Sequence, residues 1–160
     1  YYRTFGVETV CLRFGNVYGQ FSGKKDSVIA KFIKQALAGE PIIIYGDGTQ
    51  TRDFIYINDL VNSILLSATT KSIGGEIFQI ATNRETTINE IAEMLLNVFA
   101  EQGIDTPRIE KTSPRPGDVK RNFSNTSKAN RILGWICNCQ LKKGLNKTVA
   151  WFVDMERKNR

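Results

Sequence analysis

Residues 45–60 read YGDGTQTRDFIYINDL, and their two glycines lie in a polar turn between two short apolar segments. PIIIYG before the turn and RDFIYI after it are rich in β-branched and aromatic residues, a composition typical of β-strands. Gly46 and Gly48 tolerate the positive φ angles that tight turns require. We therefore expect two strands joined by a hairpin-type turn at these glycines.

Helical and strand patterns alternate along the rest of the chain. TVCLRFGNVYG (9–19) is a continuous apolar run, which predicts a strand buried on both faces. Thr87 and Glu90 have the T-x-x-E spacing of a helix capping box. Further helices are expected at 27–38, 58–68, 126–133 and from about 140, with Asn58 or Asp59 capping the second, and further strands at 76–81 and 108–113. Strands that alternate with helices predict an α/β fold.

Composition narrows the partners and the chemistry. The 160 residues are 41% hydrophobic, which is typical of one globular domain. A formal net charge of +6 favours an anionic partner such as a nucleotide, a nucleic acid or an acidic membrane surface. Because the chain has no histidine, Ser-His-Asp and HExxH sites are excluded. The three cysteines lack the paired spacings of a zinc site, so we expect ordinary thiols and no metal.

The sequence also suggests where the protein is located and whether it is a fragment. The sequence has neither an apolar run of about 18 residues nor a charged-then-apolar leader, so we expect a cytoplasmic chain without membrane contact. It opens YYRTFGVETV, without a methionine, in what the pattern predicts to be the end of a helix. We therefore expect a fragment of a longer protein.

The GDGTQT segment superficially imitates the start of a G-x-G-x-x-G dinucleotide-binding loop. Such a loop leads from a strand into a helix whose N-terminal amides meet the pyrophosphate. Here the third glycine is missing and a strand follows, so the dinucleotide interpretation fails. Arg52 could instead present a planar fork of donors to phosphate oxygens, although a surface or ion-paired arginine fits the same position.

Four separated motifs together resemble one family. LRFGNVYG (12–19), the 45–60 stretch, RPGD (115–118) and SKANRILGW (127–135) occur in the order found in the extended short-chain dehydrogenases/reductases. The resemblance covers essentially the whole chain and is to the nucleotide-sugar epimerases and dehydratases of the UDP-glucose 4-epimerase type. It implies an α/β fold that consists of the C-terminal substrate-binding part and the last strand and helix pieces of the Rossmann half.

The resemblance also implies a division of labour within the complete enzyme. Residues 1–25 would be the remnant of the Rossmann half, and residues 26–160 the nucleotide-sugar-binding domain. NAD would be bound mainly by the upstream half, with Gly15 beside the nicotinamide. The implied partner is a nucleotide sugar, with UDP-sugars favoured, and neither nucleic acid nor membrane. Family members are commonly homodimers when complete.

Substrate-binding roles follow from the same resemblance. Asn16 is implied to contact the diphosphate, and Arg52 and Arg115 to clamp the phosphates and ribose. Asp118 is implied to bind ribose hydroxyls or to orient an arginine. The helix near residue 27 resembles the segment that covers the base, with Val28 and Phe32 as candidate lining residues; core packing on an amphipathic helix is the alternative for both.

The chain departs from the family at the catalytic pair. No tyrosine is followed four residues later by a lysine, so the Tyr-x-x-x-Lys pair, in which tyrosine exchanges the sugar hydroxyl proton while NAD takes the hydride, is expected upstream. Gln20 also replaces the usual proline after NVYG. The alternatives to an epimerase fragment are a dehydratase or decarboxylase fragment, and a binding module without chemistry. A nucleic-acid binder is a third possibility, and only the net charge favours it.

Overall fold

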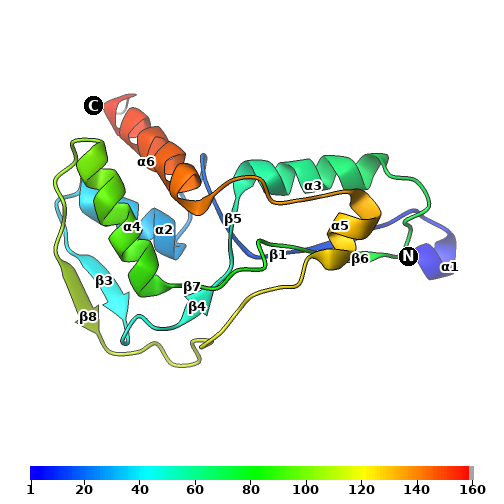
Figure 1. The fold of residues 1–160 in the computed structure, drawn as a ribbon, viewed down its shortest axis with the longest axis horizontal. Coiled ribbons are helices and arrows are strands. Elements are labelled where there is room, and N and C mark those ends of the chain that lie inside the picture. The colour runs from blue at the N-terminus through cyan, green and yellow to red at the C-terminus, as the bar shows by residue number, and fades with distance from the viewer. Residues whose placement is uncertain (159–160) are drawn as a thin grey trace.

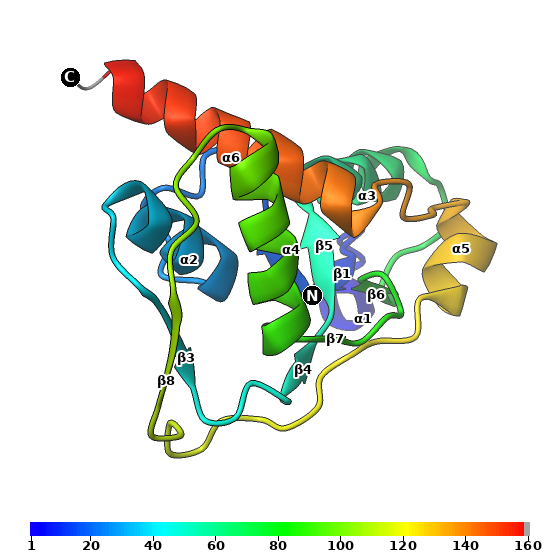
Figure 2. The same ribbon diagram turned by 60° about the vertical axis from the view of Figure 1, so that its left-hand side comes forward.

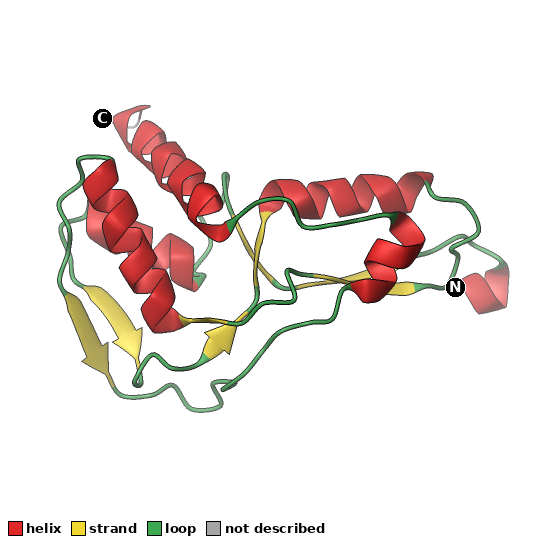
Figure 3. Cartoon of the chain, viewed as in Figure 1, coloured by secondary structure: helices red, strands yellow, loops and turns green. Residues whose placement is uncertain are grey.

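The computed structural model describes residues 1–158 of the chain. Helices and short strands alternate along them (Figures 1 and 3). The elements are α1 (Tyr2–Phe5), β1 (Cys11–Phe14), β2 (Asn16–Tyr18), α2 (Val28–Leu37), β3 (Ile42–Tyr45), β4 (Thr51–Arg52), β5 (Phe54–Tyr56), α3 (Ile57–Thr69), β6 (Ile77–Ile80), β7 (Thr86–Thr87), α4 (Ile88–Glu101), β8 (Ile109–Thr112), α5 (Ser127–Leu133) and α6 (Leu141–Lys158). The α/β class predicted from the sequence is confirmed.

The strands form short pairs rather than one continuous sheet. β1 pairs with β6, β2 with β5 and β3 with β8, each in parallel, whereas β4 and β7 are antiparallel. The β3–β8 pair lies at one end of the molecule, and β1 and β6 lie toward the other (Figure 1). β5, which pairs with β2, lies between these two ends of the molecule (Figure 1).

The predicted strand at 9–19 changes its neighbour at Gly15. The Gly15 amide donates to the carbonyl oxygen of Ile80 at 3.0 Å, and the next amide, that of Asn16, donates to the carbonyl oxygen of Asp53 at 2.6 Å. A Cβ added at Gly15 would lie 2.7 Å from that Asp53 oxygen. A side chain has no room there, so glycine allows the chain to pass from β6 to β5.

The prediction that this whole run is buried on both faces is wrong. Cys11 is exposed, and Phe14 is 49% exposed. Among residues 1–158, β1 has a paired neighbour on one edge only, and α5 packs mainly against β6. The apolar run therefore predicted the presence of β-structure correctly, but it did not predict how much of β1 is exposed.

The glycine turn has the conformation that its sequence predicts, but it does not close a hairpin. Gly46 and Gly48 have φ angles of 74° and 79°. The hairpin prediction is wrong because β3 pairs with β8 and β4 pairs with β7. Asn89 near the start of α4 provides the physical reason: its amide donates to the Gly48 carbonyl at 3.0 Å, and its side chain donates to the Asp47 carbonyl at 3.0 Å. The turn is thus bound to α4.

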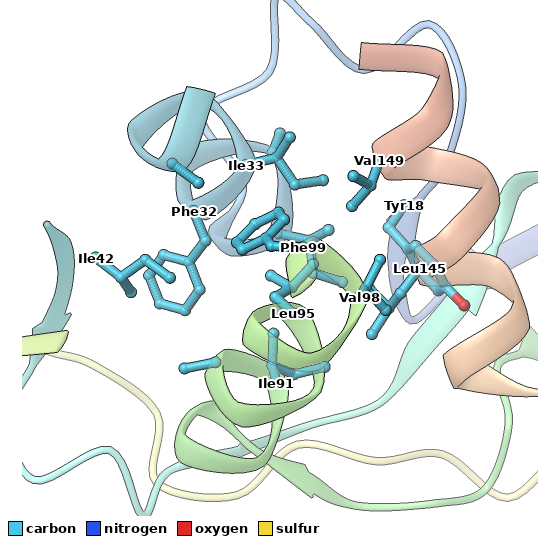
Figure 4. Close-up of a cluster of buried hydrophobic side chains, with 14 of the residues drawn as sticks. Tyr18, Phe32, Ile33, Ile42, Ile91, Leu95, Val98, Phe99, Leu145 and Val149 are labelled. Atoms are coloured by element: carbon cyan, nitrogen blue, oxygen red, sulfur yellow. The ribbon is translucent and has the colours of Figure 1, made fainter. Parts of the chain in front are cut away.

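The larger hydrophobic cluster lies among α2, α4 and α6 (Figure 4). Figure 2 shows α2 and α4 next to each other, with α6 crossing above them. Phe32, Phe99 and Val149 contribute one almost fully buried side chain from each helix. The predicted capping box is confirmed, because Thr87 Oγ1 accepts the Glu90 amide at 3.1 Å and Glu90 Oε2 accepts the Thr87 amide at 2.7 Å. The box fixes where α4 begins.

A smaller hydrophobic cluster lies among α3, α5 and β6. Trp135 is buried in it and donates through Nε1 to the Asp59 carbonyl oxygen at 2.9 Å. The prediction that Asn58 or Asp59 caps α3 is wrong, since Tyr56 is at the N-cap position. The Asp59 carboxylate instead accepts the Cys139 amide at 2.9 Å, so a distant segment satisfies it.

β5 separates the two clusters. Phe54 and Tyr56 belong to the larger cluster, and Ile55 between them belongs to the smaller. Its partner β2 alternates in the same way, with Tyr18 in the larger cluster and Val17 against the smaller. The division of the chain at residue 25 stays a prediction; the β2–β5 pair supplies side chains to both clusters.

Candidate functional site

A pocket of about 200 Å³ lies where β2, the start of α2, the β3–β4 turn and the loop after β8 meet. All six residues that the sequence suggests as substrate ligands line it: Asn16, Val28, Phe32, Arg52, Arg115 and Asp118. These residues come from four separated parts of the chain. The pocket therefore brings the predicted ligands together, while the binding role of each stays a prediction.

Arg52 is held in place by acceptors of the chain itself. Its Nη1 donates to the Thr51 carbonyl oxygen at 2.8 Å and to the Val119 carbonyl oxygen, and its Nη2 forms an ion pair with Asp118. Its side chain is 16% exposed. A guanidinium fixed by three partners keeps its remaining N–H groups in one orientation, which is the condition for directional recognition of an anion.

Asp118 contacts an arginine, although its side chain is 32% exposed. In addition to the Arg52 pair, its Oδ2 lies 3.5 Å from the Gln50 side-chain nitrogen. Gln50 also donates to the Tyr45 carbonyl oxygen at 2.9 Å, which ties the RPGD loop to the end of β3. Of the two roles that the resemblance implies for Asp118, these contacts favour the orientation of an arginine.

Two cationic side chains from different segments, Lys31 and Arg115, lie over the aromatic ring of Tyr45. The Arg115 guanidinium carbon lies 3.9 Å from the ring centroid, and Lys31 Nζ lies 4.8 Å from it. Lys31 Nζ also donates to the Tyr45 hydroxyl at 3.2 Å. Hydrogen bonds from Arg115 and then from Lys31 lower the pKa of the Tyr45 phenol. The ring and its two cations form a positively charged wall of the pocket.

Ser27 stands at the start of α2 with an unused hydroxyl. It is the N-cap residue of this helix, yet its side chain makes no capping hydrogen bond. Ser27 lines the pocket, and its Oγ is buried and has no hydrogen-bond partner among residues 1–158. The first amides of a helix also lack intrahelical acceptors and favour negative charge. This end of the pocket thus offers donors to an anion.

Val28 and Phe32 occupy the boundary between core and pocket. Phe32 is 1% exposed and belongs to the larger hydrophobic cluster, and Val28 packs against the same cluster. Both also line the pocket. The two interpretations from the sequence are therefore compatible, because one helix face supplies both the core and the apolar floor.

Among the pocket residues that sequence reasoning missed, Ser27, Lys31, Tyr45 and Gln50 carry polar side chains. Tyr45 carried a usable signal, because an aromatic residue before a Gly-Asp-Gly turn stands at the end of its strand. Ser27 was visible as a helix cap but not as an unsatisfied one. Lys31 and Gln50 carried no such signal, since their roles depend on contacts with Tyr45.

Other site types find no support in the described part of the chain. Within residues 1–158, no cluster of three or more histidine, cysteine, aspartate or glutamate side chains could hold a metal ion. No helix in this range combines the length and the apolar character that a membrane crossing requires.

Solved structures share this fold. The UDP-glucose 4-epimerase of Thermotoga maritima, in complex with UDP-glucose, matches with a TM-score of 0.87 and 33% identity, over 97% of this chain and 49% of that chain. The UDP-glucuronic acid 4-epimerase of Bacillus cereus, in complex with UDP-glucuronic acid and NAD, matches with a TM-score of 0.86 and 29% identity, over 96% and 48%. The matched region is the C-terminal portion of these α/β enzymes.

Sequence relatives agree with the structures. A putative UDP-glucose 4-epimerase of Methanocaldococcus jannaschii is 35% identical over 159 residues, which are 98% of this chain and 50% of the relative. UDP-glucuronic acid decarboxylase 1 of Danio rerio is 34% identical over 153 residues, 95% of this chain and 35% of the relative. A model of the NAD dependent epimerase/dehydratase family matches residues 1–81, and the chain belongs to this family. It spans half or less of the length of these relatives.

The described residues do not fit a dinucleotide-binding loop. The Gly46–Gly48 turn leads into β4 rather than a helix, and its Asp47 carbonyl oxygen accepts both Asn89 and Lys111 side chains. Gly15 does not line the pocket and packs against the backbone of Asp53. Its contact with NAD stays a prediction, and no hydride-transfer step is assigned to this chain.

Proposed function

We propose that this chain is the nucleotide-sugar-binding part of an NAD-dependent nucleotide-sugar epimerase and that it binds UDP-sugars. The observation that carries the proposal is the meeting of Asn16, Arg52 and Arg115 at one pocket. Two similar epimerases whose structures contain UDP-glucose or UDP-glucuronic acid support the UDP preference. The catalytic tyrosine and lysine and the NAD loop would belong to the part of the enzyme outside this chain.

The diphosphate would bind among Arg52, Asn16 and the first turn of α2. Each charge-assisted hydrogen bond contributes about 1.5 to 3 kcal/mol net, so two or three of them account for much of a micromolar affinity. The buried Ser27 hydroxyl has no partner among residues 1–158 and would donate to the same phosphates, which supports this proposal. The positive charge of Arg52, Arg115 and Lys31 exceeds the negative charge of Asp26 and Asp118 in the pocket lining.

The base would bind beside Tyr45. Arg115 now covers that ring at 3.9 Å, so a base that stacks on the same face would displace it. We infer that Arg115 leaves the ring when it turns to the phosphates and that the base stacks in its place. The pocket volume of about 200 Å³ is smaller than the roughly 300 to 1,000 Å³ of common ligand sites, which agrees with a loop that must open.

The reaction subclass is a finer proposal than the binding function. Similar proteins include UDP-sugar 4-epimerases and a UDP-glucuronic acid decarboxylase, so shared binding residues fit both reactions. We favour epimerisation, with a dehydratase or decarboxylase as the alternative. The complete polypeptide is incubated with NAD and either UDP-glucose or UDP-glucuronic acid, and the products are identified by NMR. A 4-epimer of either sugar supports epimerisation, a dehydrated product of UDP-glucose supports a dehydratase, and a decarboxylated product of UDP-glucuronic acid supports a decarboxylase.

The binding proposal is tested separately from the reaction. Calorimetry with UDP-, dTDP- and GDP-sugars on the complete polypeptide should give the tightest binding for a UDP-sugar. If no nucleotide sugar binds but DNA binds with a steep salt dependence, the proposal fails in favour of a nucleic-acid binder. A homodimer of the complete protein also stays a prediction, and sedimentation of that protein measures it.

A further inference from the structure

Asp53 lies within the wall of the pocket but faces away from it. Its neighbours Arg52 and Phe54 both line the pocket, whereas Asp53 does not. Successive side chains of an extended segment point to opposite sides, so the carboxylate points behind the wall. The residue is 0% exposed. A buried carboxylate is costly unless donors satisfy it, so its partners define what it does.

Four donors from two distant segments satisfy the Asp53 carboxylate. Oδ1 accepts the Thr82 amide at 2.7 Å and the Thr82 hydroxyl at 2.6 Å. Oδ2 accepts the Asn83 amide at 2.9 Å and the Ser124 amide at 3.4 Å. These donors are neutral N–H and O–H groups. Each carboxylate oxygen of Asp53 accepts two of these donors. An asparagine at this position would replace one of the oxygens by an NH₂ group, which is itself a donor and would face two other donors.

The Asp53 backbone links the carboxylate to the pocket. Its carbonyl oxygen accepts the Asn16 amide at 2.6 Å, which fixes the strand that carries Asn16. The carboxylate also accepts the amide of Ser124, which lies at the end of the 119–124 segment. At the start of this segment, the Val119 carbonyl oxygen accepts a hydrogen bond from the Arg52 guanidinium. One residue thus joins the strand of Asn16, the strand of Arg52 and the segment that holds the Arg52 side chain.

We propose that Asp53 is a positioning residue for the phosphate-binding groups of Asn16 and Arg52. The inference rests on the proposed function, because these groups are phosphate ligands only if the pocket binds a nucleotide sugar. Without the carboxylate, the 82–83 loop and the 119–124 segment lose their common acceptor. The side chains of Asn16 and Arg52 then lose their fixed separation, and the affinity for a diphosphate falls although neither residue has been changed.

The test compares two buried aspartates in the complete polypeptide. Asp53→Asn removes the anchor, and Asp59→Asn removes a matched carboxylate that accepts the Cys139 amide at 2.9 Å and does not line the pocket. Melting temperatures report folding, and calorimetry with UDP-glucose reports affinity at a temperature where each variant is folded. We expect both variants to melt earlier. Only Asp53→Asn should lose affinity, by about 10- to 100-fold, the range found when partners of metal-binding side chains are removed.

A double-mutant cycle with Arg52→Ala separates positioning from general loosening of the fold. If Asp53 acts through Arg52, Asp53→Asn should weaken UDP-glucose binding much less in the Arg52→Ala background than in the wild type. Equal losses in both backgrounds, equal losses for Asp53→Asn and Asp59→Asn, or unchanged affinity of a folded Asp53→Asn protein would each overturn the inference. In all three outcomes the wild type still binds, so the proposed function survives.

A milder variant covers the case in which Asp53→Asn does not fold. Thr82→Val removes one donor to Oδ1 and keeps the carboxylate. It should weaken UDP-glucose binding severalfold, and an unchanged affinity overturns the inference. Wild-type protein that binds neither UDP-glucose nor UDP refutes the proposed function itself, and the positioning role with it.

Discussion

Arg52→Ala is the most direct perturbation of the proposed phosphate site. The substitution removes charge-assisted hydrogen bonds to the diphosphate, each of which contributes about 1.5 to 3 kcal/mol. Loss of one corresponds to a weakening of about 10- to 150-fold, since about 1.4 kcal/mol is a factor of ten. The cost to folding should be smaller. Its partner Asp118 has a side chain that is 32% exposed, and an ion pair open to solvent contributes about 0 to 1 kcal/mol.

The assay is calorimetry of the complete polypeptide with UDP-glucose, with uridine as a second ligand that lacks the phosphates. Arg52→Ala should weaken UDP-glucose strongly and uridine little. Arg52→Lys should recover part of the loss, because it restores the charge but not the planar fork. Arg108→Ala is the matched control, since Arg108 is 79% exposed and pairs with Glu110 away from the pocket. Unchanged UDP-glucose affinity in a folded Arg52→Ala protein would refute the assignment.

Three further predictions address the base site, acid stability and thiol reactivity. Tyr45→Leu should weaken UDP by roughly tenfold but leave inorganic pyrophosphate unaffected in calorimetry, because only UDP has a base to stack; equal losses contradict base stacking. Arg121 lowers the pKa of Glu85 from 4.5 to about 2, so this stabilisation is complete above pH 4.5 and is lost as the pH falls toward 2. The denaturation midpoints of wild type and Glu85→Gln should therefore differ at pH 7 and converge near pH 2; a constant gap contradicts this. Burial raises the pKa of Cys137 to about 12, so a thiol reagent at pH 8 should modify it far more slowly than exposed Cys11, as peptide mass spectrometry would measure. Fast labelling of Cys137 in the folded chain would show that the thiol is accessible.

Local signals predicted the elements well, and long-range partners decided the rest. The capping box at Thr87 and Glu90 is a contact over three residues, so the sequence alone is sufficient to predict it. The partner of β3 is different, because β8 lies more than 60 residues further along the chain and no turn residue identifies it. The same limit explains the missed N-cap of α3, where a distant backbone amide at Cys139 satisfies Asp59.

The candidate site was predictable from its motifs but not from any single residue. Arg52 and Arg115 lie in separate motifs whose order pointed to one family, and both line the pocket. Their present contacts could not be inferred, because Asp118 and Tyr45, which hold the two guanidinium groups, are distant from them in the sequence. Asp53 was hidden for a related reason: beside Arg52 in the sequence it resembles a surface charge, and only its contacts to Thr82 and Ser124 reveal an anchor.

The two arginines of the pocket should act at different stages of binding. Arg52 already has three acceptors from the chain, so little rotamer entropy remains to be lost when a phosphate arrives. In the proposed binding mode Arg115 leaves the Tyr45 ring and is then ordered again, which would cost about 0.5 to 1.5 kcal/mol for a long side chain and the cation–π contact in addition. A diphosphate therefore gains most by meeting Arg52 and the start of α2 first. In the proposed binding mode the base takes the place of Arg115 on Tyr45, and a ligand without a base lacks this contact. The pocket would in this way distinguish a nucleotide sugar from a simple sugar phosphate.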